Sequence, residues 1–415
     1  MHVDMIITSI GQLLTLAGPA RARRGDEMNQ LGIVTDGALA IEKGKIVAID
    51  SAEAIGKKYT ATQMIDASGK VVMPGFVDPH THVVFMHTRE KEFEMRIQGK
   101  TYVEISLAGG GIRSSIQSVR DASEDDLYLR AKKHVQRMMA CGTTTMESKS
   151  GYGLSTRSEL KMLRVNRRLQ EDLPVDIVST FLGAHEFPIE YKDNRDEYIR
   201  ILKEEMMPAV LAENLAEYCD IFTEAHVYTI NQSRDLMAHA KNLGFKLRFH
   251  ADEIEPIGGA ELAGELGAVS ADHLGACSDA GIVAMRDAGT IATLLPGTIF
   301  SLGMPRYARA RDMISAGLPV ALATDYNPGS CNCDSMSMVI TLACLQMRMT
   351  PAEAICASTI NAAYALERGD KVGSLEVGKQ ADILVLDAPG YQFIPYHFGS
   401  GCIEMVIKNG NIIVN

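Results

Sequence analysis

Hydrophobic residues follow two different patterns along the chain. Near both ends, short apolar runs alternate with turn residues, which is typical of β-strands. These runs lie at residues 5–7, 37–42, 45–49, 382–386, 404–408 and 411–414, and Asn409-Gly410 is typical of a hairpin turn. We therefore expect both termini to form one discontinuous accessory β-sandwich domain, residues 1–68 and 375–415.

The middle of the chain alternates strand-like runs with longer amphipathic stretches such as 159–172 and 233–243, as in repeated βα units. Eight runs end near His80, Glu147, His185, Glu224, His250, His273, Pro296 and Asp325. Nearly all finish on a polar or ionisable residue, and in a (β/α)8 barrel such strand ends form the reaction face. An open doubly wound sheet would bring fewer strand ends together. We predict an α/β fold in which residues 69–374 form a TIM-like (β/α)8 barrel.

Composition and charge narrow the range of partners. The 415 residues are 46% hydrophobic and carry a formal net charge of −11 without a Lys/Arg-rich run, which disfavours nucleic acid and anionic lipid. No apolar stretch approaches the ~20 residues of a membrane span, and residues 1–5 lack the basic start of a signal peptide, so we expect a cytoplasmic protein. The eight scattered cysteines suit reduced thiols. Cys331 and Cys333 could be half of a zinc site, but no second pair has suitable spacing.

His80 and His82 follow the apolar run 71–77 at positions i and i+2. On an extended strand both imidazoles point to the same side, and neutral imidazole is a good ligand for Zn²⁺ or Fe²⁺. Alone, the pair could equally be two solvated or hydrogen-bonded loop histidines. His250, His273 and Asp325, however, each end another predicted strand, and a barrel would bring all five side chains together. The pattern therefore predicts a metal site.

Five candidate ligands are one more than a catalytic ion needs, because such an ion keeps one position open for water. We assign four of them to the metal: His80, His82, His250 and Asp325. His273 is left to orient the attacking water and to stabilise charge on the substrate oxygen. Glu253 is expected near the open position, where it can accept the proton of the water or bind substrate. Its alternative role is a carboxylate at a helix N-terminus, stabilised by the helix dipole.

Around these residues the sequence resembles the amidohydrolase superfamily, and within it the enzymes of histidine degradation that open an imidazolone ring. The likeness covers essentially the whole chain. Its carriers are residues 74–82 (PGFVDPHTH), 149–154 (KSGYGL), 181–185 (FLGAH), 250–253 (HADE) and 323–330 (ATDYNPGS). The first segment is common to the superfamily, whereas 149–154, 181–185 and 325–330 are much more specific. The stretch 331–334, with Cys331 and Cys333, departs from the family pattern. This departure affects the expected rim of the site near Ser330 and leaves the metal ligands unchanged.

The resemblance implies a hydrolase that opens the lactam C–N bond of 4-imidazolone-5-propanoate to N-formimidoyl-L-glutamate. It implies a zinc or iron ion (Fe²⁺ or Fe³⁺), a homodimer, and Asp325 as the relay of a proton to the leaving ring nitrogen. The residues it assigns to the substrate are Arg89, Tyr152, His185, Glu253, Asn327, Gly329 and Ser330. A guanidinium suits an anionic substrate of an acidic protein, although Arg89 could also be a surface residue paired with Glu90 or Glu92.

Two other functions stay open at this point. Another cyclic amidohydrolase or a nucleobase deaminase on the same scaffold would share the metal chemistry. Arg89 discriminates between them, because a neutral nucleobase has no carboxylate to occupy it. A metal-free, non-enzymatic assembly protein would have lost metal ligands, and none of the ligands is lost here.

Overall fold

The computed structural model describes residues 1–100, 104 and 110–415. Its central sheet has eight parallel strands that neighbour one another in sequence order. They are β8 (Phe76–Asp78), β9 (Thr143–Lys149), β10 (Asp176–Ala184), β11 (Tyr218–Thr223), β12 (Lys246–Ala251), β13 (Ser270–His273), β14 (Ile291–Leu294) and β15 (Val320–Leu322). Beyond the two end strands, Thr81 forms a parallel bridge with Tyr326, and the Asp325 N–H donates to the His80 carbonyl at 3.0 Å. These bonds join the two edges of the sheet, and the predicted eight-stranded barrel is confirmed.

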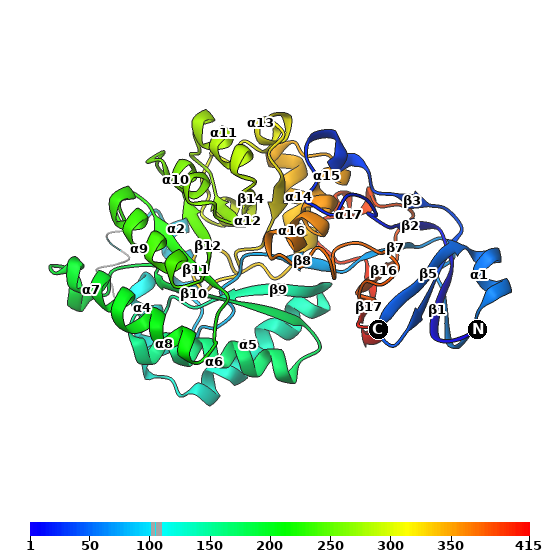
Figure 1. Ribbon diagram of the computed structural model, residues 1–415, viewed down its shortest axis with the longest axis horizontal. Helices are drawn as coiled ribbons and strands as arrows, with labels where there is room; N and C mark the ends of the chain where they lie inside the picture. The colour runs from blue at the N-terminus through cyan, green and yellow to red at the C-terminus, as the bar shows by residue number, and fades with distance from the viewer. Residues whose placement is uncertain (101–103, 105–109) are drawn as a thin grey trace.

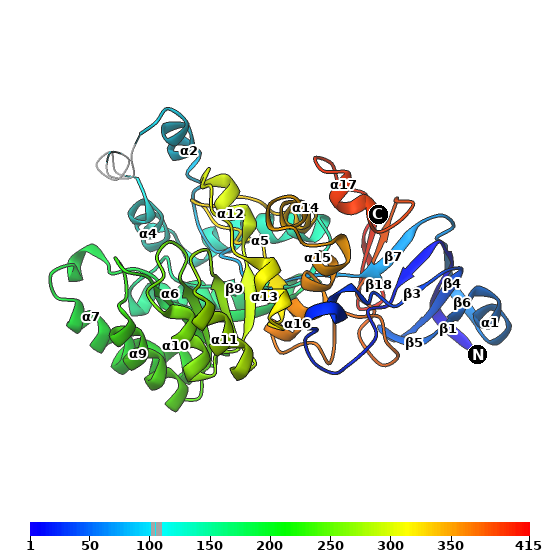
Figure 2. The same ribbon diagram turned by 90° about the horizontal axis from the view of Figure 1, so that it is seen from above.

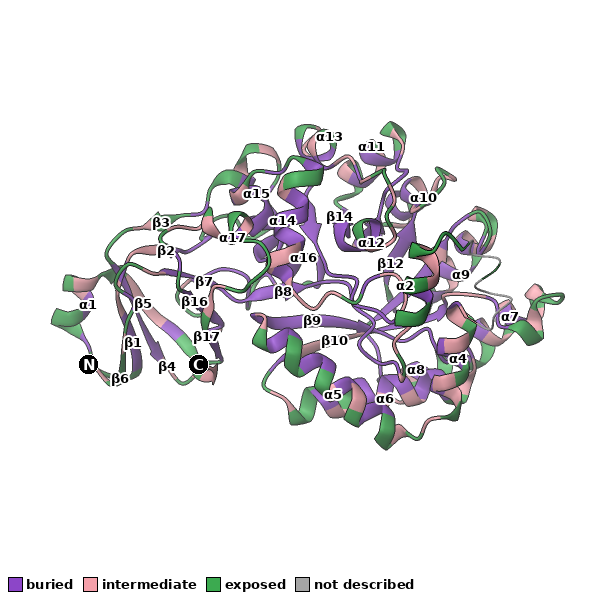
Figure 3. Ribbon diagram, turned by 180° about the vertical axis from the view of Figure 1, so that it is seen from behind, coloured by how far each residue is buried: buried purple, intermediate pink, exposed green. Residues whose placement is uncertain are grey.

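Helices surround this barrel and turn their buried faces toward it (Figure 1, Figure 3). They are α2 (Glu90–Ile97), α4 (Ile112–Asp121), α5 (Glu124–Ala140), α6 (Thr156–Asp172), α7 (Arg195–Ile201), α8 (Met207–Ala212), α9 (Ile230–Asn242), α10 (Gly259–Leu266), α11 (Asp279–Ala288), α12 (Pro296–Ser301), α13 (Ala310–Ser315), α14 (Met336–Met347), α15 (Pro351–Ala357) and α16 (Ile360–Ala365), with the short turns η2 (Ile189–Tyr191) and η3 (Leu202–Met206). Helix α9 begins with a capping box between Thr229 and Gln232, and its buried Leu236 and Ala240 are four residues apart. The two helical stretches predicted at 159–172 and 233–243 correspond to α6 and α9.

Strands from both ends of the chain form two further sheets beside the barrel (Figure 1, Figure 2). The four-stranded sheet holds β5 (Lys45–Ser51), β4 (Gly37–Glu42), β1 (His2–Ile10) and β6 (Thr60–Asp66). The six-stranded sheet holds β18 (Asn411–Val414), β17 (Ile403–Lys408), β16 (Ile383–Leu386), β7 (Val71–Pro74), β2 (Gln12–Leu14) and β3 (Ile33–Val34). Short helices η1 (Gly25–Asn29), α1 (Ala52–Lys58) and α17 (Phe393–Tyr396) complete this region. Buried side chains of both sheets, including Ile7, Leu39, Val72 and Ile383, pack into one apolar cluster, as expected for a sandwich.

A single glycine joins strand β7 of the terminal sheet to strand β8 of the barrel. The apolar run 71–77 contains two strands, because β7 pairs with β16 in the terminal sheet and β8 pairs with β9 in the barrel. Gly75 lies between them, and a Cβ at this position would collide with Thr144. Strand β7 therefore belongs to the terminal sheet although it falls within the range 69–374, and the domain limits stay a prediction.

The predicted strand ends agree with the structure to within three residues. His80 lies just after β8, behind Pro79, which has no N–H for the sheet. Asp325 lies three residues after β15 with a φ of 54°, a left-handed conformation that turns the chain away from the strand direction. No helix within the described part of the chain is both long enough and apolar enough to cross a bilayer.

Candidate metal and substrate site

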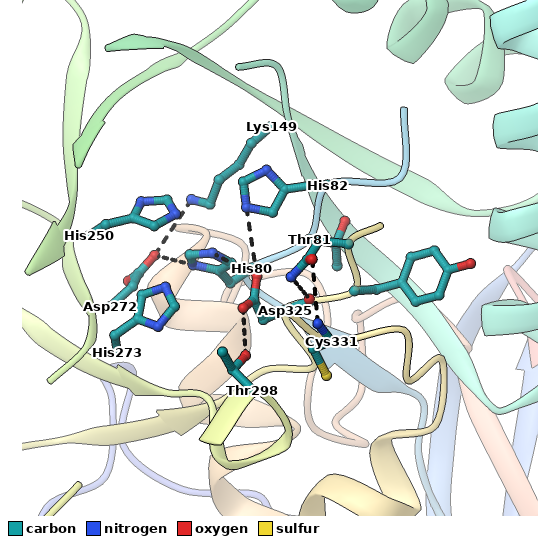
Figure 4. Close-up of polar contacts among 12 residues, drawn as sticks. His80, Thr81, His82, Lys149, His250, Asp272, His273, Thr298, Asp325 and Cys331 are labelled. Carbon is teal, nitrogen blue, oxygen red and sulfur yellow. Dashed lines mark hydrogen bonds and ion pairs between the residues drawn. The ribbon is translucent and has the colours of Figure 1, made fainter. Parts of the chain in front are cut away.

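Four side chains meet where the barrel strands end (Figure 4). His80 and His82 follow β8, His250 lies in β12, and Asp325 follows β15. His80 Nε2 lies 3.5 Å and His82 Nε2 lies 3.7 Å from the same oxygen, Asp325 Oδ1. The ring centroids of His80 and His250 are 4.5 Å apart. The structure thus brings together all four residues that we assigned to the metal.

The spacing of these atoms suits a shared ion. N···O separations of 3.5 and 3.7 Å are too long for good hydrogen bonds, whereas ligand atoms bound to one tetrahedral ion lie about 3.4 Å apart. His80 Nε2 is buried and has no hydrogen-bond partner among the described residues. Burial holds the pKa of the His80 and His82 imidazoles well below its usual value, and neutral imidazole is the form that binds metals. The residues present therefore fit a divalent ion.

His273 and His185 lie close enough to this cluster to take part in it. One ligand atom each from His80, His250 and His273 can be chosen within 4.8 Å of one another, and the same holds for His82, His185 and His250. The His185 ring stacks on His82 with centroids 5.2 Å apart, and its Nδ1 lies 3.0 Å from the Gly151 carbonyl oxygen. All five histidines thus surround one space.

Two of the proposed ligand imidazoles each contact a buried carboxylate through Nδ1. Asp272 Oδ2 lies 2.7 Å from His80 Nδ1, and Asp220 Oδ2 lies 3.0 Å from His250 Nδ1. Although burial opposes it, the Asp220 carboxylate raises the pKa of His250. A carboxylate on one ring nitrogen fixes the tautomer of a histidine and leaves its other nitrogen for a metal. Both rings are therefore held in the orientation that a metal ligand needs.

Our reading of the sequence missed these supporting residues. Asp220 and Asp272 lie within β11 and β13, Lys149 ends β9, and all three are fully buried. A charged residue inside an apolar strand is the signal that could have identified them, because such a group is rarely buried without a partner. Thr298 of α12 donates its hydroxyl proton to Asp325 Oδ2 at 2.5 Å, and no sequence signal marks it.

The cluster opens into a cavity of about 490 Å³, a usual size for a small-molecule site. The cavity is lined by these residues of the predicted catalytic and substrate set: Arg89, Tyr152, His185, Glu253, His273, Asn327 and Ser330. It is also lined by Ile112, Glu186, Phe222, His226 and Ile254, which the sequence did not single out. Gly329 does not line it. A Cβ at Gly329 would collide with the Arg89 guanidinium, so this glycine lets Arg89 pack over the backbone.

Arg89 brings a guanidinium to this cavity. Its side chain is 16% exposed, and its buried Nε has no hydrogen-bond partner in the described part of the chain. Glu92 Oε2 is 3.6 Å from that Nε, and Glu92 Oε1 accepts a hydrogen bond from the Gly111 N–H instead. Arg89 is thus not an exposed surface arginine: it keeps a long ion pair with Glu92 through Nε, and its side chain lines the cavity.

Glu253 and His273 form a mostly buried pair in the cavity wall, with Glu253 Oε1 3.6 Å from His273 Nδ1. Burial raises the pKa of Glu253 to about 7 and lowers the pKa of His273 to about 4. Neutral His273 can donate an N–H, and Glu253 can accept a proton near neutral pH. The Glu224 carboxylate accepts hydrogen bonds from the N–H groups of Ile254 and Glu255 at 3.0 and 3.2 Å, which fixes the loop that carries Glu253.

A carboxylate other than that of Glu253 caps the N-terminus of α10, the helix that follows this loop. Asp252 accepts hydrogen bonds from the N–H groups of Gly258, Gly259 and Ala260, at 2.9 to 3.1 Å, where α10 begins. The alternative role considered for Glu253 therefore belongs to its neighbour Asp252.

Asn327 organises the turn along the other edge of the cavity. Its Oδ1 accepts hydrogen bonds from the N–H groups of Gly329 and Ser330, both at 2.8 Å, and its Nδ2 donates to the Asp325 carbonyl at 2.7 Å. Cys331 is buried behind this turn, where its carbonyl accepts a hydrogen bond from the Asn327 N–H at 2.7 Å. The cysteine that departs from the family pattern thus supports the rim without lining the cavity.

Known proteins share both the sequence and the fold. The sequence pattern of the amidohydrolase family matches residues 71–413. An imidazolonepropionase of Alkaliphilus oremlandii is 46% identical over 416 residues, which cover 100% of this chain and 99% of that protein. An imidazolonepropionase of Geobacillus kaustophilus is 49% identical over 409 residues, which cover 97% of this chain and 96% of that protein. A zinc-bound adenosine deaminase of Xanthomonas campestris, at 18% identity, has a TM-score of 0.72 and covers 100% of this chain and 93% of its own, which shows a shared fold.

Proposed function

Because this chain belongs to the amidohydrolase family and, within it, to the imidazolonepropionases, we propose that it hydrolyses 4-imidazolone-5-propanoate to N-formimidoyl-L-glutamate. In this reaction the lactam C–N bond breaks and a C–O bond to water forms. One proton of the water ends on the released nitrogen. The reaction would place the protein in histidine degradation.

One observation carries this proposal beyond family membership: a single cavity holds both the histidine cluster and the Arg89 guanidinium. The substrate has two corresponding ends, a ring carbonyl to be attacked and a carboxylate tail. A neutral heterocycle would need only the first of the two groups. The pairing of both groups in one space therefore favours an anionic heterocyclic substrate.

The side chains of the cavity suit separate tasks in the reaction. Arg89 binds the propanoate, and Tyr152 and His185 contact the ring. Glu253 accepts the proton of the attacking water, since its raised pKa of about 7 places it near balance at neutral pH. His273 donates a hydrogen bond to the carbonyl oxygen as negative charge develops there. Asp325 takes up the remaining proton of that water as the product carboxylate forms and passes it to the leaving ring nitrogen.

The proposed metal ligands are His80, His82, His250 and Asp325. A divalent ion bound by them would polarise the carbonyl and make a bound water more acidic. Three imidazoles and one carboxylate suit zinc or iron, and we propose one of these two ions. Gly329 would act indirectly, by allowing Arg89 to pack over it, while Asn327 and Ser330 form the opposite edge for the ring.

The proposal is tested by turnover. Purified protein loaded with zinc or iron is incubated with enzymatically made imidazolonepropanoate, and the loss of its ultraviolet absorbance is followed. We expect N-formimidoyl-glutamate as the product by mass, and no turnover after the metal is removed by chelation. Metal-loaded protein that leaves the substrate unchanged would contradict the proposal.

The nearest rival is another cyclic amidohydrolase or a nucleobase deaminase, because the fold is shared with an adenosine deaminase. A panel of purines, pyrimidines and neutral cyclic amides separates these activities, and higher kcat/KM on any of them than on imidazolonepropanoate would favour the rival. We also propose a cytoplasmic homodimer, which light scattering of the purified protein and cell fractionation would test.

A further inference from the structure

A group of buried charges lies beside the proposed metal site and has no task in the reaction proposed above. Its members are Lys149, Glu147, Asp220, Arg248 and Asp272, and all five side chains are 0% exposed. They come from strands β9, β11, β12 and β13. Buried ion pairs can often be replaced by apolar residues without loss of stability. A cluster of five such charges therefore points to a role other than stability.

Lys149 is the centre of this group. Its Nζ lies 2.8 Å from Glu147 Oε2, 2.7 Å from Asp220 Oδ2 and 3.5 Å from Asp272 Oδ2. An ammonium has three donors, and three carboxylates surround this one. Lys149 therefore holds the Asp220 oxygen closely, and it contributes, together with Arg248 at 3.4 Å, a longer ion pair to the Asp272 oxygen.

The same two oxygens contact the proposed metal ligands, and Figure 4 shows the contact of Asp272 with His80. Asp272 Oδ2 is 2.7 Å from His80 Nδ1, and Asp220 Oδ2 is 3.0 Å from His250 Nδ1. Each bridging oxygen thus lies between the ammonium and one imidazole. Since His80 follows β8 and His250 lies in β12, a single side chain links ligand residues from opposite parts of the barrel.

The group holds a second cation beside Lys149. Arg248 supplies the second cation, with its Nε 2.9 Å from Glu147 Oε1 and its Nη2 3.4 Å from Asp272 Oδ2. Three carboxylates thus face two cations, Lys149 and Arg248, within one buried group.

We propose that Lys149 is a positioning residue of the metal site. With Arg248, it fixes the Asp220 and Asp272 oxygens so that His80 and His250 both present Nε2 to one ion. This inference rests on the proposed function, because it assumes the metal site described above.

The test compares two buried lysines. Lys149→Met removes the ammonium and keeps the length of the side chain. Lys408→Met is the matched control, because Lys408 of β17 is 1% exposed and its Nζ is 2.6 Å from both Asp382 Oδ2 and Asp176 Oδ2. Asp176 begins barrel strand β10, at the strand end away from the metal site. For each protein we measure the zinc dissociation constant by chelator competition, the d–d spectrum of the Co²⁺ form, and Tm.

We expect Lys149→Met to weaken zinc binding 10- to 100-fold and to alter the Co²⁺ spectrum, as seen when residues behind metal ligands are changed. Lys408→Met should lower Tm to a similar extent with unchanged zinc affinity and spectrum. Wild-type affinity and spectrum in Lys149→Met would overturn the inference. If that variant does not fold, Lys149→Gln replaces it and is judged by the same criteria. If neither Lys149 variant folds although Lys408→Met does, Lys149 is needed for folding, and the inference is overturned as well. A wild-type protein that binds no zinc or iron would instead contradict the proposed function.

Discussion

Replacing Arg89 by methionine removes the guanidinium from the cavity while keeping much of the apolar length of the side chain. Hydrogen bonds to charged groups contribute about 1.5–3 kcal/mol each, and a guanidinium can make two to one carboxylate. Arg89 is 16% exposed, so solvent screens the pair only in part. We therefore expect Arg89→Met to cost about 3 kcal/mol of substrate binding, on the order of 100-fold in kcat/KM, mainly through KM.

The assay needs a control for damage to the nearby loop. Arg96 is the matched residue, because its Nη1 and Nη2 lie 3.5 Å from the Gly329 carbonyl oxygen, yet it lines a neighbouring hollow and not the substrate cavity. Steady-state kinetics of wild type, Arg89→Met and Arg96→Met are compared on imidazolonepropanoate and on its propanoate amide, which has no negative charge. Arg89→Met should lose activity on the acid alone, and Arg96→Met should lose little on either compound. Equal losses on the acid and on the amide would refute the reasoning.

Three further changes test the other parts of the site. Glu253→Gln should lower kcat by about 10²- to 10⁴-fold with full metal content. Because the Glu253 carboxyl, whose pKa is about 7, must be ionised to accept a proton, kcat/KM of the wild type should fall as the pH drops below about 7. A Glu253→Gln variant that keeps both this fall and full turnover would exclude the role. Glu224→Gln weakens the acceptor of the Ile254 and Glu255 N–H groups and should lower kcat about 10-fold at unchanged zinc affinity, whereas an unchanged kcat would show that the loop does not need this anchor. Thr298→Val removes the hydroxyl that donates to Asp325 and should weaken zinc binding about 10-fold in chelator competition with little change in Tm; equal affinity would show that the hydroxyl is dispensable.

The barrel and most of the cavity were predictable because strand ends in a barrel share one face. His80, His250 and Asp325 are more than 70 residues apart in sequence, and only the count of strands between them places them together. The location of Arg89 followed from family resemblance, whereas its burial and its long ion pair with Glu92 required the structure.

Other features depend on contacts that no local pattern shows. Gly75 divides one apolar run between two sheets, because Thr144 of another strand leaves no room for a Cβ. Asp252 and Glu253 are adjacent carboxylates, and only the direction of each side chain separates the helix cap from the cavity residue. The link from Lys149 to two ligand histidines joins four strands and could not be derived from spacing.

The most direct test of the account follows the oxygen of water. Metal-loaded protein and chelator-treated protein are each incubated with imidazolonepropanoate in ¹⁸O-labelled water, and the product is analysed by fragment mass spectrometry. The account predicts N-formimidoyl-glutamate with one heavy oxygen in the carboxylate derived from the ring carbonyl, formed only by the metal-loaded protein and restored when metal is added back. Product formed equally fast after complete metal removal, or no labelled product from the metal-loaded protein, would contradict it.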